Sequence, residues 1–288
     1  MKAVTTTILL LLSVLHCCTA QPARGFSAAF YDADGLYDTI PSSFYDDGDY
    51  TPRGRLRWDS RRYTRKVESV ARLIDSLATD LVALYGVENE QVVRDITAAC
   101  RCDYAYVHAT SDSDNGLDFA LLYFGDRFMP ERTIRWSNAL AIRGTACGRP
   151  LTIVITHRCS SLGVLTARLR EMYGAAEDNN IMIMGTPNKL NFPEYGFRDA
   201  TARAERAGRG NTVRAGNWQM RDRIATNISG IACCDVYAAR GCSRARVNRL
   251  RHTTAADTSA DADVTCPYSY ISTKHLHINE KVIILYNI

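Results

Sequence analysis

Short apolar runs of strand length recur along this chain, and they outnumber the helical segments. They come in groups rather than in strict strand–helix alternation, which predicts mixed or antiparallel sheets with helices outside, an α/β sandwich. Helical segments are recognised by apolar residues at three- and four-residue spacing, and they lie at 63–78, 91–99 and 162–173. The strand-like runs are 26–31, 81–85, 104–108, 118–124, 133–142, 151–157, 181–184, 231–237, 268–272 and 281–286.

The composition agrees with one globular domain. Hydrophobic residues make up 46% and charged residues 23% of the 288 residues, which is typical of a folded protein. The net charge of +4 is too small for a histone-like nucleic-acid binder. The longest apolar run, Ile8–Leu15, is shorter than the roughly 20 residues that a membrane-spanning helix needs, so we expect no transmembrane segment. No break in the chain resembles a linker.

The first twenty residues have the pattern of a secretory signal peptide. Lys2 supplies the positive start, Ile8–Leu15 the apolar core and Cys18-Thr19-Ala20 a cleavage site of small residues. We therefore expect a secreted or periplasmic protein whose mature domain spans residues 21–288. A lipid anchor on a cysteine is less expected, because His16 is a poor residue just before it.

Ten cysteines are present, and two of them, Cys17 and Cys18, lie in the signal segment. The remaining eight are an even number in an exported chain, which favours some disulfides besides buried thiols. No Cys-x-x-Cys pair occurs, so a structural zinc site is not favoured. The eight are Cys100, Cys102, Cys147, Cys159, Cys233, Cys234, Cys242 and Cys266.

Several apolar runs end directly in polar residues, where rigid strands can aim side chains into a shared cleft. Asp32 and Asp34 follow the first run, and Glu88 follows 81–85 shortly after its end. His157 ends the run at 151–157. Asn188 lies just beyond 181–184, and His275 ends a later short segment. These residues are the candidate functional site.

Seven blocks of sequence, in this order, resemble those of the endonuclease/exonuclease/phosphatase family of metal-dependent phosphoesterases. Each block alone is a weak signal, but seven in the family's order are specific for its fold. The resemblance covers most of the chain from residue 26 onward and implies a four-layered α/β sandwich. The blocks are FYDADGLYD (30–38), ALYGVEN (83–89), YVHATSDSDNGLDFALLY (106–123), ITHRCSS (155–161), IMIMGTPNK (181–189), GNWQMRDRI (216–224) and TKHLHI (273–278).

The resemblance implies roles for individual residues. His157 matches the histidine that contacts the phosphate, Asn188 the asparagine of the GDxN block, and His275 the final histidine. Asp32 falls on an asparagine of the metal site, where a carboxylate could still hold Mg²⁺ or Mn²⁺. Asp222 matches an aspartate whose role is more structural.

Three acidic positions of the family motif are missing. Gly86 stands where the metal-binding glutamate is expected, and Thr186 replaces the aspartate that positions the attacking water. Lys274 replaces the acidic residue before the final histidine, and Lys189 replaces a further acidic position. Phosphodiester hydrolysis of this kind needs a divalent cation and an activated water. These departures predict a degenerate member, a pseudoenzyme without a metal cofactor.

Such a protein would bind rather than cleave. Its ligand would be a phosphate ester, a nucleic acid or another protein, with Lys189, Lys274 and arginines supplying charge in the ancestral cleft. One alternative is an active secreted phosphodiesterase or nuclease, with Mg²⁺ or Mn²⁺ held in a shifted site by Asp32 and Glu88. If the strand continues, Glu88 lies on the same face as Gly86, about 6.5 Å along it. Another alternative is a disulfide-stabilised adhesion module in which the cleft has no role.

Overall fold

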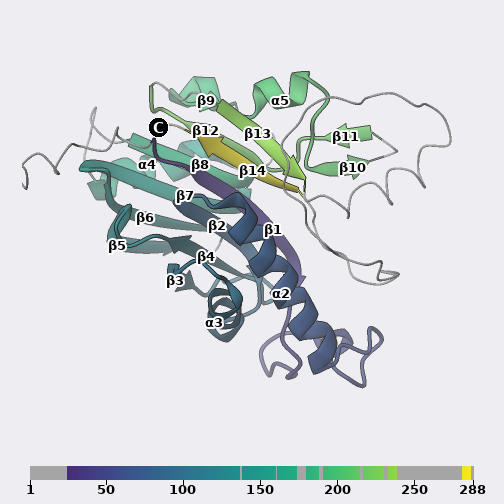
Figure 1. The fold of residues 1–288 in the computed structure, drawn as a ribbon. Helices are drawn as coiled ribbons and strands as arrows, with labels where there is room; N and C mark the ends of the chain where they lie inside the picture. Colours follow the sequence, from purple (N-terminus) through teal and green to yellow (C-terminus); the bar gives the residue numbers. More distant parts are fainter. Residues whose placement is uncertain are drawn as a thin grey trace, which may run out of the picture.

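The computed structural model describes residues 25–136, 138–159, 161–173, 180–187, 191–214, 217–229, 233–238 and 281–286 (Figure 1). The predicted signal segment and the predicted strand at 268–272 lie outside these ranges. The same holds for four of the predicted site residues, which are Asn188, Lys189, Lys274 and His275.

The first sheet has six strands in the order β13-β14-β1-β2-β4-β3. Strands β1 and β2 run parallel, and the helix α2 (Ser60–Leu77) makes the crossover between them that a parallel pair requires. The other neighbours are antiparallel. The strands are β1 Ala28–Leu36, β2 Leu81–Val87, β3 Ala105–Ala109, β4 Asp118–Tyr123, β13 Cys233–Ala238 and β14 Lys281–Tyr286.

The second sheet repeats this plan. It has six strands in the order β5-β6-β7-β8-β12-β9, in which β7 and β8 run parallel and α4 (Leu162–Tyr173) connects them. Its other neighbours are antiparallel. The strands are β5 Phe128–Trp136, β6 Ala139–Ala146, β7 Arg149–Cys159, β8 Asn180–Pro187, β9 Arg198–Asp199 and β12 Arg223–Thr226.

Smaller elements complete the described fold. They are α3 (Glu90–Ala99), α5 (Ala202–Arg206), the two-stranded pair β10 (Thr212–Arg214) and β11 (Asn217–Gln219), and short 3-10 turns at Gly48–Tyr50 and Phe192–Tyr195.

Three apolar clusters define four layers. One cluster, which includes Phe30 and Leu140, lies between the two sheets. A second joins α2 and α3 to the outer face of the first sheet through residues such as Ile74. A third joins α4 to the second sheet through Leu165 and Val154. The order helix–sheet–sheet–helix confirms the predicted α/β sandwich.

Helix α2 illustrates how the sequence sets an element. The Asp59 side chain caps its start by accepting a hydrogen bond from the Arg62 N–H at 2.9 Å. Val67, Val70 and Ile74 form its buried face, as their spacing predicts. Ala78 ends the helix in the left-handed conformation.

A buried lysine on α2 also holds the end of β1 in place. Lys66 is only 4% exposed, and its Nζ donates to the carbonyls of Asp34 at 3.2 Å and Gly35 at 3.0 Å. Asp34 and Gly35 have positive φ angles of 50° and 70°, so the chain turns sharply there. Lys66 thus stabilises the turn that follows Asp32.

The structure corrects two details of the sequence interpretation. The predicted single strand at 133–142 is two antiparallel strands, β5 and β6, which pair across a turn at Asn138 with Trp136 opposite Ala139. The polar stretch 198–223 contains β9, α5, β10 and β11. Elements of two to five residues carry too little apolar periodicity to be recognised from sequence.

The described cysteines do not support the predicted disulfides. Cys100, Cys102, Cys147 and Cys159 are free thiols. Cys242 and Cys266 lie outside the described residues, so their pairing stays a prediction. Among the helices that the structure describes, none is both long and apolar enough to cross a membrane.

Candidate functional site

The two parallel strand pairs carry polar residues to one place between the sheets. Asp32 of β1 lies opposite Tyr85 of β2, and His157 of β7 lies opposite Thr186 of β8. The Tyr85 and His157 rings stack, with centroids 4.0 Å apart and planes 14° apart. Because one ring comes from each sheet, this stack joins the two strand pairs. We call Asp32, Tyr85, His157, Thr186, Arg221 and Asp222 the inter-sheet site.

Arg221 bridges the two sheets at this site. Its Nη2 donates to Asp32 Oδ2 at 2.6 Å and to Asp222 Oδ2 at 3.3 Å, and its Nε donates to Asp222 Oδ1 at 3.2 Å. The carboxylate side chains are 6% and 1% exposed, whereas that of Arg221 is 37% exposed. One guanidinium is therefore shared by two buried carboxylates.

Asp222 is the most densely bonded residue of the site. Besides Arg221, it accepts hydrogen bonds from Thr186 Oγ1 at 2.5 Å and from Asn211 Nδ2. The side-chain Oδ1 of Asn211 in turn accepts hydrogen bonds from the backbone N–H of Arg221 and of Asp222. The sequence patterns identify Asp222 and Thr186, and they include Arg221 only among the arginines that could supply charge to the cleft; they do not indicate Asn211. Arg221 lies next to Asp222 within the 216–224 block and also belongs to the arginine-rich stretch 198–223.

Asp32 is held as a buried carboxylate. Its Oδ1 accepts the backbone N–H of Asp34 at 2.9 Å, and Arg221 occupies Oδ2. Burial and the charge of Asp222 raise the pKa of Asp32 to about 6, and Arg221 offsets part of this rise. Both oxygens of the predicted metal ligand therefore already have partners within the chain.

Gly86 leaves no room for the glutamate that the family resemblance implies at this position. Its φ angle is +85°, in the left-handed region that side chains rarely adopt. A Cβ atom built there would lie 2.8 Å from Asp32 Oδ1. The local backbone thus requires glycine, and this position offers no ligand atom.

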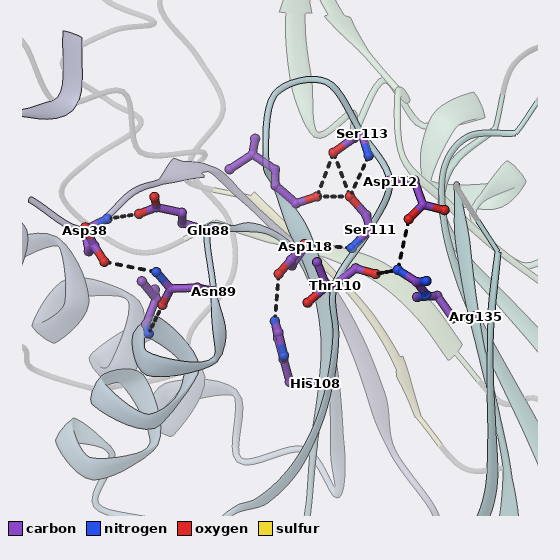
Figure 2. Close-up of polar contacts among 12 residues, drawn as sticks. Asp38, Glu88, Asn89, His108, Thr110, Ser111, Asp112, Ser113, Asp118 and Arg135 are labelled. Atoms are coloured by element: carbon purple, nitrogen blue, oxygen red, sulfur yellow. Dashed lines mark hydrogen bonds and ion pairs between the residues drawn. The ribbon is translucent and has the colours of Figure 1, made fainter. Parts of the chain in front are cut away.

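Glu88 bonds to the loop after β1 and, in the described structure, to no residue of the inter-sheet site. Figure 2 shows it beside Asp38, whose backbone N–H donates to Glu88 Oε2 at 2.5 Å. The Tyr45 hydroxyl donates to Oε1 at 2.9 Å. Burial raises the pKa of Glu88 to about 7, although both hydrogen bonds favour the ionised form. Glu88 therefore holds this loop in place.

His157 is a neutral, poorly hydrogen-bonded imidazole. Its Nδ1 is buried and has no hydrogen-bond partner among the described residues. Burial, with the positive charges of Arg158 and Arg221, lowers the pKa of His157 to about 4. At pH 7 the ring is therefore neutral. One of its nitrogens can donate a hydrogen bond and the other can accept one.

The residues present do not fit the divalent metal that the resemblance implies. The described part of the chain contains no group of three or more His, Cys, Asp or Glu side chains that could hold a metal ion. Mg²⁺ prefers several hard oxygen ligands, including one or two carboxylates. Asp32 is bonded to Arg221, and Glu88 has a separate set of partners. The shifted site of Asp32 and Glu88 is not assembled.

A second cluster has the residue types of a nucleophilic triad but not its geometry (Figure 2). His108 Nε2 lies 2.9 Å from Asp118 Oδ2, and Asp118 Oδ1 accepts the Ser111 backbone N–H at 2.7 Å. The Ser111 hydroxyl instead contacts the Leu117 carbonyl and Ser113, each at 2.6 Å. A nucleophilic serine must bond to its histidine. The hydrogen bonds of this cluster therefore stabilise the conformation of the loop between β3 and β4.

Comparison with known proteins supports the resemblance. The model of the Endonuclease/Exonuclease/phosphatase family matches residues 27–149. The matched part includes Asp32, Gly86 and Glu88 but ends before His157. No curated protein has a sequence that matches this chain.

Solved structures share the fold over nearly the whole chain. A mannosyl-6-phosphatase of Bacteroides thetaiotaomicron has a TM-score of 0.56 at 11% identity, covering 90% of this chain and 98% of that one. Truncated TDP2 of Caenorhabditis elegans has a TM-score of 0.53 at 14% identity, covering 91% and 97%. TDP2 of D. rerio, complexed with a single-strand DNA product, has a TM-score of 0.50 at 13% identity, covering 91% and 98%. The predicted fold is thereby confirmed.

Proposed function

We propose that this chain is an endonuclease/exonuclease/phosphatase-family protein that has lost metal-dependent hydrolysis and binds a phosphate-containing ligand at the inter-sheet site. One observation carries the proposal. The guanidinium of Arg221 lies between Asp32 and Asp222, so the carboxylate of Asp32, the predicted metal ligand, is already paired with a cation of this chain.

Several further features support the loss of hydrolysis. Gly86 offers no ligand atom, and a hydroxyl, that of Thr186, stands where the resemblance expects the carboxylate that activates water. His157, with a pKa of about 4, is not a general acid at neutral pH. Loss of one catalytic group of this sort lowers the rate on the order of 10²-fold, so their combined loss leaves little turnover.

Anion binding is supported by the donors that remain at the site. Arg221 bonds to the two carboxylates through Nε and Nη2, and its Nη1 makes no hydrogen bond to the residues that the structure describes. Arginine donates charge-assisted hydrogen bonds to phosphate oxygens. A structural neighbour is named a mannosyl-6-phosphatase and another was solved with a DNA product, so phosphate ligands suit this fold.

The loss of hydrolysis is tested with bis(p-nitrophenyl) phosphate and a single-stranded oligonucleotide, in the presence of Mg²⁺ or Mn²⁺. We expect no turnover above that of buffer. Metal-dependent hydrolysis that His157→Ala abolishes would overturn the proposal and favour the alternative hypothesis of an active phosphodiesterase.

Ligand binding is tested by calorimetry in EDTA with inorganic phosphate, a mononucleotide and a short single-stranded oligonucleotide. We expect saturable binding that weakens with salt and is lost in Arg221→Met. Arg223→Met is the matched control, because Arg223 lies two residues away and pairs with Asp199 and Glu205 instead. If none of the three probes binds, the phosphate ligand is wrong and a protein ligand becomes the leading candidate.

We also propose that residues 1–20 direct export and are removed. The support is the sequence pattern alone: Lys2, the apolar run Ile8–Leu15 and the small residues before Gln21. Expression of the full chain in a secreting host, followed by mass spectrometry, tests this. We expect an N-terminus at Gln21 and a disulfide between Cys242 and Cys266, the two mature-chain cysteines outside the described residues. Retention of residues 1–20 in the cell-associated protein would contradict export.

A further inference from the structure

We propose that Arg221 is a tethered cation that excludes divalent metal, and that removing its charge creates a Mn²⁺ or Mg²⁺ site between Asp32 and Asp222. The inference rests on the proposed loss of metal chemistry but is independent of any phosphate ligand. It concerns two carboxylates of this chain and the one side chain that holds them together.

The two carboxylates share a single counter-charge. Asp32 comes from β1 of the first sheet, and Asp222 immediately precedes β12 of the second. Both are buried, and the only side-chain cation that contacts either of them in the described structure is Arg221, at 2.6 Å and 3.2 Å. The nearest buried lysine, Lys66, donates instead to the backbone carbonyls of Asp34 and Gly35.

Without the guanidinium, two buried negative charges would face one space. Buried carboxylates must be paired with a cation, hydrogen-bonded or protonated. Oxygen atoms suited to a hard cation already lie around the space: those of Asp32 and Asp222, with the Thr186 hydroxyl bonded to Asp222 Oδ1. Mg²⁺ and Mn²⁺ bind through one or two carboxylates and retain several waters. A hydrated divalent ion therefore suits the vacated position.

The native chain prevents this because Arg221 competes from within the molecule. A group fixed to the same chain acts at a high effective concentration, on the order of millimolar or more. A metal ion must displace two ion pairs and leave the arginine without its partners. Arg221 can thus fulfil the electrostatic role of a bound metal without supplying Lewis-acid chemistry.

The test is a Mn²⁺ titration by calorimetry of Arg221→Met, with the native chain beside it. We expect no binding to the native protein at millimolar Mn²⁺, and one Mn²⁺ per chain in Arg221→Met with a dissociation constant in the micromolar-to-millimolar range. Two controls are matched. Arg221→Lys retains the positive charge and should not bind Mn²⁺, and Arg223→Met removes a neighbouring arginine and should not bind it either.

A double variant identifies the ligands. The double variant, Arg221→Met with Asp222→Asn, should bind Mn²⁺ at least tenfold more weakly than Arg221→Met alone. A folded Arg221→Met protein that binds no Mn²⁺ would overturn the inference, as would Mn²⁺ binding to the native chain that Asp32→Asn removes.

If Arg221→Met does not fold in EDTA, its refolding is followed by circular dichroism. Recovery by Mn²⁺, but not by NaCl of equal ionic strength, supports the inference, and no recovery contradicts it. The result is separable from the proposed function. Metal-dependent hydrolysis by the native chain would contradict the proposed function. Failure of Arg221→Met to bind metal would contradict only the proposal that Arg221 excludes a metal ion.

Discussion

Two arginines only two residues apart show how differently one side chain can be used in this fold. Arg221 crosses from the second sheet to the first and pairs with Asp32 and Asp222, which are almost fully buried. Arg223, on β12, stays within its own sheet region and pairs with Asp199 of β9 and Glu205 of α5. Each arginine contacts two carboxylates, and both sets of contacts include distances of 2.6 Å.

The difference lies in what would remain if each arginine were removed. The partners of Arg223 are 19% and 43% exposed, so water can solvate them. The partners of Arg221 are 6% and 1% exposed and would face each other. Distances alone therefore do not distinguish a solvated ion pair from a buried one that joins the two sheets. Burial of the anions, and the strands from which they come, make the distinction.

The largest expected effect is on stability. In EDTA at pH 7, Arg221→Met should lower the free energy of unfolding by about 3–5 kcal/mol, because it leaves uncompensated buried charge. Arg223→Met should lower it by about 1 kcal/mol or less, because its partners are solvated. Urea denaturation of both variants measures the difference. Equal losses would show that the two ion pairs are alike and would remove the basis of the comparison.

The next effect concerns the glycine beside Asp32. Gly86→Ala should destabilise the fold by about 1–3 kcal/mol, because a side chain is strained at φ +85° and its Cβ would approach Asp32 Oδ1. Gly148→Ala is the matched control, since Gly148 has φ +75° but no atom within 4 Å of a built Cβ. Thermal denaturation should show a smaller loss for Gly148→Ala. If the losses are equal, Asp32 does not crowd this position.

A smaller effect is that Glu88 and Glu205 should contribute to stability with opposite dependence on pH. Burial raises the pKa of Glu88 from 4.5 to about 7, so its contribution to stability is present below pH 4.5 and lost as the pH rises to about 7. The hydrogen bond from Arg223 lowers the pKa of Glu205, so its contribution is present above pH 4.5 and lost as the pH falls further.

Denaturation of Glu88→Gln and Glu205→Gln across pH 3–8 checks these signs. Glutamine at 88 can still accept from the Asp38 N–H and can donate to the Tyr45 oxygen, so Glu88→Gln should remove a fall in stability toward neutral pH. Glu205→Gln should remove a fall in stability toward acid pH. If both variants change the profile in the same direction, the assigned environments are wrong.

The smallest effect is a titration without a change of fold. Because the folded-state pKa of His157 is lowered from 6.5 to about 4, its stabilising contribution is present above pH 6.5 and lost as the pH falls through about 4. NMR of the imidazole nitrogens should give a midpoint near pH 4 in the native chain. A midpoint near 6.5 would show that the ring is solvated rather than enclosed beside Tyr85.

Sequence alone predicted most of the architecture. The helix at 162–173 and the strand at 281–286 have the predicted bounds, and α2 and α3 lie within a few residues of theirs. These elements carry amphipathic or continuous apolar patterns, which local sequence displays directly. The predicted strand at 133–142 failed because β5 is largely exposed along its length, so polar residues hid its beginning.

The site was predicted only in part. Asp32, Thr186, His157 and Asp222 were identified because they lie in blocks that resemble a known family. The pairing of Arg221 with Asp32 was not predicted, because it joins residues 189 positions apart and no local pattern reports such a pair. Glu88 was placed on the face of Gly86, but the β1–β2 pairing shifts register near there, which changes the direction of the strand.

The position of β14 has a consequence for how the chain is made. β14 (281–286) lies between β13 and β1 in the first sheet. Strand β1 is the first described strand to be synthesised, and β14 is the last. One of the two neighbours of β1 is therefore missing until all the other described strands have been made. Until then β1 presents an open backbone edge able to pair with another chain. Translation that stops short of residue 281 would therefore leave this edge of β1 uncovered, and such a product would be prone to self-association.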